Sequence, residues 1–407
     1  TKLLSYEFHM NSVVRQMWEQ NTDVVMVDTG NSYEGLCEYV GGKYISYTDE
    51  HPITMNPFAI KREELNIEKI GFLKNLIMLI WKGTQGEVTK TEDRLVEQVI
   101  TEYFDEYFVK KRIDNLSFNT FYEYSTVRIP TIIKENNLAG IDLAAYNYLL
   151  KDFYKGGSHE LTLNENLDTK LFDETFIVFE IDSIKDDPLL FPLVTLIIMD
   201  VFIQKMRIKK NRKVLVIEEA WKAIASPMMA EYIKYLYKTA RKFWASVGVV
   251  TQEIQDIVGS PIVKEAIINN SDVVMLLDQA KFRERFDEIK AILGLTDVDC
   301  KKIFTINRLE NKEGRSFFRE VFIRRGSVGA VFGVEEPHEC YMTYTTERAE
   351  KEALKLYKKE LQCDHQHAIE AYCRDWELSG ISKSLPFAKR VNQTGHVLHL
   401  TPHNQSE

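Results

Sequence analysis

Short apolar runs recur along this chain, several of them ending in polar residues, and each run predicts a buried β-strand. They lie at residues 23–28, 44–47, 176–181, 213–218, 246–252 and 271–277. Segments with helical spacing lie between several of them, at residues 8–20, 189–206 and 228–244. Because strands and helices alternate, the pattern predicts an α/β fold with a mostly parallel sheet and helices on both faces.

Residues 61–155 have a different pattern, with helical spacing and almost no strand signal. Apolar residues recur at helical intervals in residues 67–81, 91–110 and 117–136. Thr91 and Glu92 form a capping signal at the start of the second of these segments. We interpret the region as an all-α insertion between two strands of the core sheet.

Beyond residue 277 the pattern changes again. Residues 281–293 and 297–304 have helical spacing, and alternating residues on both sides of Gly326 predict a β-hairpin. Two more helices are expected at residues 346–361 and 365–378, followed from residue 382 by a polar tail that we expect to be loose. The chain thus divides into residues 1–60 (first part of the core), 61–155 (insertion), 172–345 (rest of the core) and 346–407 (C-terminal helices and tail).

The run that begins at Lys213 ends in two adjacent acids, Glu218 and Glu219, which Ala220 and Trp221 follow. A parallel strand delivers such residues to the carboxyl edge of its sheet, where α/β folds bind ligands. There the first acid can hold Mg²⁺ and the second can orient an attacking water molecule. A strand that ends in a solvated pair of glutamates is the alternative interpretation.

Two further strand ends carry polar side chains. Gln252 ends the strand after the two acids, and an amide at that place can contact a γ-phosphate or the attacking water. Asp28 ends the first strand and precedes the turn Thr29-Gly30-Asn31-Ser32. A dinucleotide-binding role for Asp28 is excluded, because no glycine-rich turn precedes the neighbouring helix.

The sequence contains no phosphate-binding motif of the form GxxxxGK[ST]. A phosphate cradle needs glycines, so that backbone N–H groups can approach the phosphates, and a lysine that neutralises charge. Residues 1–7 provide no such loop. Either a phosphate loop is missing between Glu7 and Phe8, or the protein is a degenerate homologue that does not hydrolyse nucleotide. We expect the first, because both acids and Gln252 are intact.

The charge, the cysteine content and the apolar runs of the chain restrict the kinds of protein it can be. The net charge of −9 over 407 residues provides no global basic field for nucleic acid, although a local basic patch is compatible with it. Five scattered cysteines suit a reducing compartment. The longest apolar run, residues 189–203, contains Pro192 and Asp200 and is too short to span a bilayer. We therefore expect an intracellular protein, able to dock on a membrane complex.

Several short stretches together carry a family resemblance. The chain resembles the C-terminal ATPase domain of the large ATPase shared by type IV secretion and conjugation systems, and is most similar to the TraG-type ATPase of conjugative transposons. That family places its phosphate loop directly before the residues that match Phe8. The matching stretches are Phe8-His9-Met10-Asn11 with Val14-Arg15-Gln16, Val27-Asp28-Thr29-Gly30, Met55-Asn56-Pro57-Phe58, Val216-Ile217-Glu218-Glu219-Ala220-Trp221, Arg241-Lys242-Phe243-Trp244 and Val250-Thr251-Gln252-Glu253.

The resemblance implies a RecA-like P-loop NTPase fold, ATP and Mg²⁺ as cofactors, and a role for each matched position. Glu218 would occupy the Mg²⁺ position, with direct or water-mediated contact left open. Glu219 would be the catalytic carboxylate and Gln252 the γ-phosphate sensor. Arg241 would reach the phosphate of a neighbouring subunit, with Lys242, Arg324 and Arg325 as alternatives. Phe8, His9 and Asp28 would lie around the nucleotide.

The resemblance also implies a biological setting. The intact protein would be an ATP-hydrolysing motor that energises assembly of the transfer apparatus or substrate translocation. Its partners would be other copies in a hexamer, inner-membrane proteins of the secretion channel, and DNA or a nucleoprotein substrate. It would lie in the cytoplasm, peripheral to the inner membrane. A DNA-translocating or coupling-type ATPase and a non-hydrolysing scaffold remain alternatives.

Overall fold

A five-stranded parallel sheet forms the centre of the molecule, and the strands follow the spatial order β2-β3-β1-β4-β5. The computed structural model describes residues 6–166, 169–219, 227–251, 267–308 and 318–398. All four strand pairs are parallel, which confirms the predicted α/β fold with a mostly parallel sheet. The strands are β1 (Thr22–Asp28), β2 (Lys43–Ser46), β3 (Phe176–Glu180), β4 (Arg212–Glu218) and β5 (Ala245–Val250).

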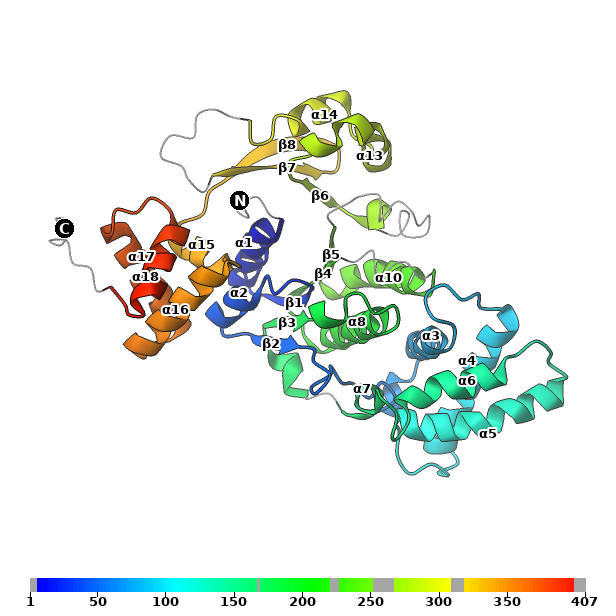
Figure 1. Cartoon of the computed structure of the whole chain (residues 1–407). Helices are drawn as coiled ribbons and strands as arrows, with labels where there is room; N and C mark the ends of the chain where they lie inside the picture. Colours follow the sequence, from blue (N-terminus) through cyan, green and yellow to red (C-terminus); the bar gives the residue numbers. More distant parts are fainter. Residues whose placement is uncertain (1–5, 167–168, 220–226, 252–266, 309–317, 399–407) are drawn as a thin grey trace.

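Helices cover both faces of this sheet because its central strands are apolar on both sides. Val24 and Met26 pack with Val14 of α1 (Tyr6–Glu19) and with residues of α2 (Glu34–Tyr39). Val25 and Val27, which point to the opposite face, join a larger cluster. That cluster includes residues of α3 (Ile67–Lys82), α8 (Leu190–Ile208) and α10 (Pro227–Ala240). Figure 1 shows α8 and α10 beside the sheet on this side.

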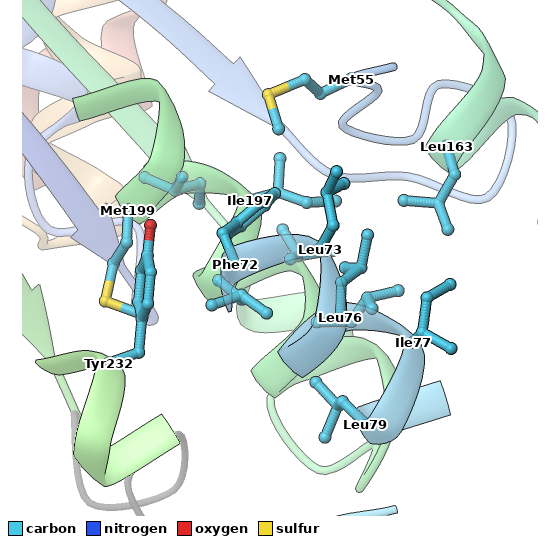
Figure 2. Close-up of a cluster of buried hydrophobic side chains, with 14 of the residues drawn as sticks. Met55, Phe72, Leu73, Leu76, Ile77, Leu79, Leu163, Ile197, Met199 and Tyr232 are labelled. Carbon is cyan, nitrogen blue, oxygen red and sulfur yellow. The ribbon is translucent and has the colours of Figure 1, made fainter. Parts of the chain in front are cut away.

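A helical region lies between β2 and β3, as the insertion pattern predicted. Three of its helices begin at polar N-cap residues: the Asn66, Thr89 and Ser117 side chains accept hydrogen bonds from backbone N–H groups in the first turns of α3, α4 and α5. Figure 2 shows Leu73 and Leu76 of α3 beside Ile197 of α8, so the insertion and the sheet layer share one core. The elements are η2 (Arg62–Glu64), α3, α4 (Lys90–Phe108), α5 (Phe118–Asn136), α6 (Leu143–Leu150), η3 (Lys151–Phe153), α7 (Glu160–Asn164) and η4 (Thr169–Asp173).

The prediction that residues 271–277 extend the parallel sheet is wrong. The strand there, β6 (Val273–Leu276), belongs to a separate antiparallel sheet of order β6-β7-β8. Its residues alternate between exposed and half-buried, whereas β1 and β3 are buried throughout. The predicted hairpin is confirmed as β7 (Arg319–Arg325) and β8 (Val328–Val334), with Gly326 at φ 59° in its turn. Helices α13 (Phe286–Leu293) and α14 (Asp297–Ile303) contribute to the small core on this sheet.

The C-terminal helices pack around buried aromatic residues and contact α1 and α2 (Figure 1). The expectation of a loose tail from residue 382 is wrong for residues 384–394, which form a helix. That helix buries Phe387, Ala388 and Val391, whose spacing places them on one face. The elements are α15 (His338–Tyr344), α16 (Arg348–Leu361), α17 (His365–Leu378) and α18 (Ser384–Thr394). Across the described ranges, the helices all fall short of the length and hydropathy that crossing a bilayer would require.

Candidate functional site

Three acidic side chains converge at the carboxyl edge of the parallel sheet. Asp28, Glu180 and Glu218 end the adjacent strands β1, β3 and β4, and their exposed fractions are 0%, 3% and 1%. Asp28 lies opposite Glu180 in the register, and the preceding pair Val27 and Ile217 places Glu218 on the other side. Because ligands of parallel sheets bind at this edge, these carboxyl groups define the candidate site.

Asp28 organises the turn that follows β1. Its Oδ1 atom accepts the N–H of Gly30 (3.1 Å), and its Oδ2 atom accepts those of Ser32 (2.8 Å) and Tyr33 (3.2 Å). Burial raises the pKa of Asp28 despite these hydrogen bonds. The side chain therefore shapes the backbone beside the site, and the three N–H groups already use its oxygens.

Glu180 belongs to the same cluster, although sequence reasoning did not select it. It accepts the N–H groups of Asn31 (2.8 Å) and Asp182 (2.7 Å), and the Tyr44 hydroxyl donates to it as well (3.3 Å). Burial and the charge of Asp28 raise the pKa of Glu180 to about 8. The signal that could have identified it is the single acid at the end of the apolar run 176–181, in the same arrangement as Asp28.

Glu218 is the buried acid that the sequence predicted as the metal ligand. The Tyr33 hydroxyl donates a hydrogen bond to its Oε1 atom. Burial, followed by the charge of Asp28, raises the pKa of Glu218 well above its ordinary value, and Glu7 and Glu180 add to the effect. An approaching cation would therefore displace a proton from this carboxyl group.

Glu7 adds a fourth carboxyl group to this part of the molecule. It lies in the first turn of α1, and its charge acts on Glu218. Asn11 donates from Nδ2 to the Glu7 carbonyl (2.9 Å) and to the Ser32 carbonyl (3.0 Å), and so ties α1 to the turn after β1. Glu7 and Phe8 are consecutive residues of α1, and a phosphate loop missing between them stays a prediction.

Phe8 and His9 lie in α1 on the side of the C-terminal helices. The Phe8 ring packs against Tyr341 and Tyr344 of α15, at centroid distances of 6.0 and 5.3 Å. Burial lowers the pKa of His9, and the charge of Glu336 partly opposes this. Their predicted contact with nucleotide stays a prediction.

Of Glu219 and Gln252, the structure describes only Glu219. Glu219 directly follows β4 with φ 48°, a left-handed backbone conformation that is uncommon for a residue other than glycine. Such strain is often found where a side chain must be aimed at a site. Gln252 lies outside the described residues, which end at Thr251 in this part of the chain. The roles of Glu219 as the catalytic carboxylate and of Gln252 as the γ-phosphate sensor therefore stay predictions.

Arg241 lies at the opposite edge of the sheet from Glu218. It begins η6 (Arg241–Phe243), just before β5, and its Nη2 atom lies 3.2 Å from Asp272 Oδ2. The side chains of this pair are 76% and 73% exposed. Arg324 and Arg325 line a hollow of about 570 Å³ with Asp272, so these alternatives lie near the same acid, while Lys242 follows Arg241 in η6. The structure pairs Arg241 with Asp272 and does not bring it to Asp28, Glu180 or Glu218.

The acids fit the metal side of a magnesium–nucleotide site. Mg²⁺ prefers oxygen ligands and usually binds through one or two carboxylates together with water and substrate phosphates. Glu218 is the residue that would hold it, with Asp28 nearby. In the described part of the chain, no three His, Cys, Asp or Glu side chains are already arranged as a metal-ligand set. A glycine-rich loop that would cradle the phosphates is not present in this sequence.

Solved structures of VirB4 and of the conjugative coupling protein TrwB share this fold. VirB4 of Thermoanaerobacter pseudethanolicus matches with a TM-score of 0.60 at 19% identity, over 83% of this chain and 88% of VirB4. The bacterial conjugative coupling protein TrwB matches in its unbound form with a TM-score of 0.52 at 11% identity, over 83% of each chain. TrwB in complex with ADP and Mg²⁺ matches with a TM-score of 0.51 at 12% identity, over 81% of each chain.

Sequence comparison gives the family. Protein TraC of Escherichia coli strain K12 is 24% identical over 294 residues, which are 68% of this chain and 31% of TraC. The chain thus spans about a third of the length of this relative. The family model described as the TraG P-loop domain matches residues 5–376. This chain therefore belongs to the TraG P-loop domain family, the P-loop ATPases of conjugation and type IV secretion systems.

Proposed function

We propose that this chain is the ATP-hydrolysing motor domain of a conjugative transfer or type IV secretion system, which energises assembly of the apparatus or translocation of its substrate. The observation that carries the proposal is the convergence of Glu218, Asp28 and Glu180 at the carboxyl edge of a parallel sheet in a TraG-family chain. The complex of TrwB with ADP and Mg²⁺ supports the choice of nucleotide and metal.

Each predicted residue has one task in this proposal. ATP with Mg²⁺ supplies the phosphoanhydride and the charge neutralisation. Glu218 holds the metal from the end of β4. Glu219 accepts a hydrogen bond from the attacking water and orients it, and Gln252 contacts the γ-phosphate. Asp28 keeps the turn after β1 in place through its three backbone hydrogen bonds.

The position of Arg241 supports action between subunits. Its exposed side chain pairs with Asp272 at the amino edge of the sheet, away from the acids of the candidate site in its own chain. An exposed arginine at that edge can stabilise phosphate charge in a neighbouring copy. We therefore propose a hexamer in action, at the cytoplasmic face of the inner membrane and in contact with the secretion channel.

Phosphate release measures the activity directly. The purified intact protein is incubated with ATP and Mg²⁺, alongside Glu219→Gln and the control Glu352→Gln, which changes an exposed acid on α16. We expect turnover by the wild type and the control, with ATP binding but no turnover by Glu219→Gln. Near-normal turnover by Glu219→Gln would refute the assigned role of Glu219.

A second candidate, a scaffold that does not hydrolyse ATP, is favoured by the lack of a glycine-rich phosphate loop in this sequence. Titration with a fluorescent ATP analogue separates the two candidates. A wild-type chain that neither binds the analogue nor releases phosphate would establish the scaffold. Addition of DNA to the phosphate-release assay tests the coupling-type alternative. DNA should raise the rate of ATP hydrolysis by a DNA-translocating pump, and this effect should weaken as salt is added.

A further inference from the structure

A second hollow lies at the amino edge of the parallel sheet, opposite the acidic site. Its volume is about 590 Å³. Three chain segments form it: the turn between α1 and β1, the connection from α8 into β4, and the turn from η6 into β5. The residues that line it are Gln20, Asn21, Lys210, Asn211, Arg212 and Trp244.

Trp244 is held in solvent by the surrounding structure. Its side chain is 71% exposed, and its backbone has a φ of 54° in the left-handed region. Lys213 fixes this turn, because its N–H donates to the Trp244 carbonyl (3.1 Å) and its Nζ atom donates to the Phe243 carbonyl (3.0 Å). Lys213 itself is only 1% exposed. A buried lysine and an uncommon backbone conformation thus present an indole ring that most folds would cover.

The floor of the hollow is fixed as well. Asn211 donates from Nδ2 to Asp23 Oδ1 (2.6 Å), and Asp23 is buried beside the ammonium group of Lys205 (2.9 Å). Asn21 adopts a left-handed conformation with φ 61°. The hydrogen bond to the buried Asp23 thus orients Asn211, so that this side chain needs little ordering when a ligand binds.

The cations of the hollow form no ion pair with any of the residues that the structure describes. Lys210 and Arg212 have no ion pair within the residues that the structure describes, and neither has the neighbouring Lys242. By contrast, Lys209 pairs with Asp173 (2.6 Å). In a chain with a net charge of −9, these cations thus lie beside an exposed indole ring without an acidic partner among the described residues.

We propose that this hollow binds single-stranded nucleic acid. An exposed indole stacks on a base, unpaired lysine and arginine side chains contact phosphates, and neighbouring amides of Gln20 and Asn21 can hydrogen-bond to base edges. Duplex nucleic acid would contact the cations but would not present a base face to Trp244. This binding goes beyond the proposed ATPase activity and requires no nucleotide at the acidic site.

Fluorescence anisotropy with a fluorescein-labelled 20-mer of oligothymidylate, without ATP, tests the charges. The double variant Lys210→Glu with Arg212→Glu is compared with Lys355→Glu and Lys359→Glu together, which makes the same charge change on exposed residues of α16. We expect the first to weaken binding at least about tenfold at low salt and to flatten the salt dependence, by about 0.7 in log–log slope per lost phosphate contact. We expect the control to bind like the wild type. Equal affinities for the two double variants, or a wild type that does not bind, would overturn the proposal.

Tryptophan fluorescence tests the stacking. We expect an unlabelled oligothymidylate to quench the tryptophan fluorescence of the wild type. Trp244→Phe should lose most of this quenching while keeping the wild-type affinity and melting temperature. Trp244→Ala should bind about tenfold more weakly, because an aromatic platform contributes strongly to each stacked base. Unchanged quenching in Trp244→Phe would overturn the proposal. So would duplex binding as tight as single-strand binding, or a defect of these variants confined to self-association in sedimentation experiments.

Discussion

Asp28 and Glu180 lie opposite each other on β1 and β3, and their carboxyl groups divide the backbone N–H groups of one turn between them. Asp28 accepts those of Gly30, Ser32 and Tyr33, while Glu180 accepts that of Asn31. Ionising both of two buried acids that face each other costs free energy, and the pKa of each is raised. The hydrogen bonds that hold the turn beside the candidate site therefore depend on whether Asp28 and Glu180 are protonated.

This pair predicts a pH dependence of stability. The folded-state pKa of Glu180 is about 8, above its ordinary value of 4.5. The folded chain therefore holds a proton that the unfolded chain releases, and the contribution to stability is complete below about pH 4.5 and is lost as the pH rises through about 8. Melting curves of the wild type and Glu180→Gln between pH 5 and 9 measure it. We expect the melting temperature of the wild type to fall relative to that of the variant as pH rises, and a constant difference would contradict the assignment.

Metal binding should release protons at Glu218. Because burial and Asp28 raise the pKa of Glu218, a bound cation must displace a proton from it. Calorimetry of Mg²⁺ with a non-hydrolysable ATP analogue, in buffers of different ionisation enthalpy, counts these protons. We expect more proton release by the wild type than by Glu218→Gln, which should also bind more weakly. Equal proton release by both proteins would remove Glu218 from the metal site.

Glu7 should oppose nucleotide binding. Its carboxylate adds negative charge close to Glu218, at the end of α1 that would otherwise favour an anion. We expect Glu7→Gln to bind the ATP analogue about fivefold more tightly, which corresponds to roughly 1 kcal/mol. The matched control is Glu19→Gln at the far end of the same helix, where the acid pairs with Arg15 on the surface. An equal gain in the control would show a general effect of net charge rather than a local one.

The buried pair between Lys205 and Asp23 should be costly to break. Their side chains are 0% and 5% exposed, Nζ lies 2.9 Å from Oδ2, and the same ammonium group donates to the Phe172 carbonyl (2.9 Å). Lys205→Met leaves the Asp23 charge buried, and we expect a loss of about 3–5 kcal/mol in the free energy of unfolding. Urea denaturation measures it. Arg94→Ala, which breaks an exposed pair on α4, should change the free energy by less than about 0.5 kcal/mol.

Local pattern predicted most of the parallel core. The continuous apolar runs that became β1, β3 and β4 indicated strands buried on both faces, and the helical segments of the insertion carry their own capping residues. The acid at the end of each run is visible in the sequence, so Asp28 and Glu218 could be selected. Glu180 ends its run in the same way, but only the pairing of β3 with β1 shows that it lies beside Asp28.

The sequence by itself determined which segments are buried strands, which are helices, and that acids end the strands, because burial and capping leave a periodic signal in neighbouring residues. Only the tertiary structure decided which strands pair. It removed β6 from the parallel sheet, folded α18 onto the C-terminal core, and placed Arg241 and Trp244 at the edge opposite Glu218. Those outcomes depend on contacts between residues far apart in the chain, and a local pattern of apolar and polar residues does not predict such contacts.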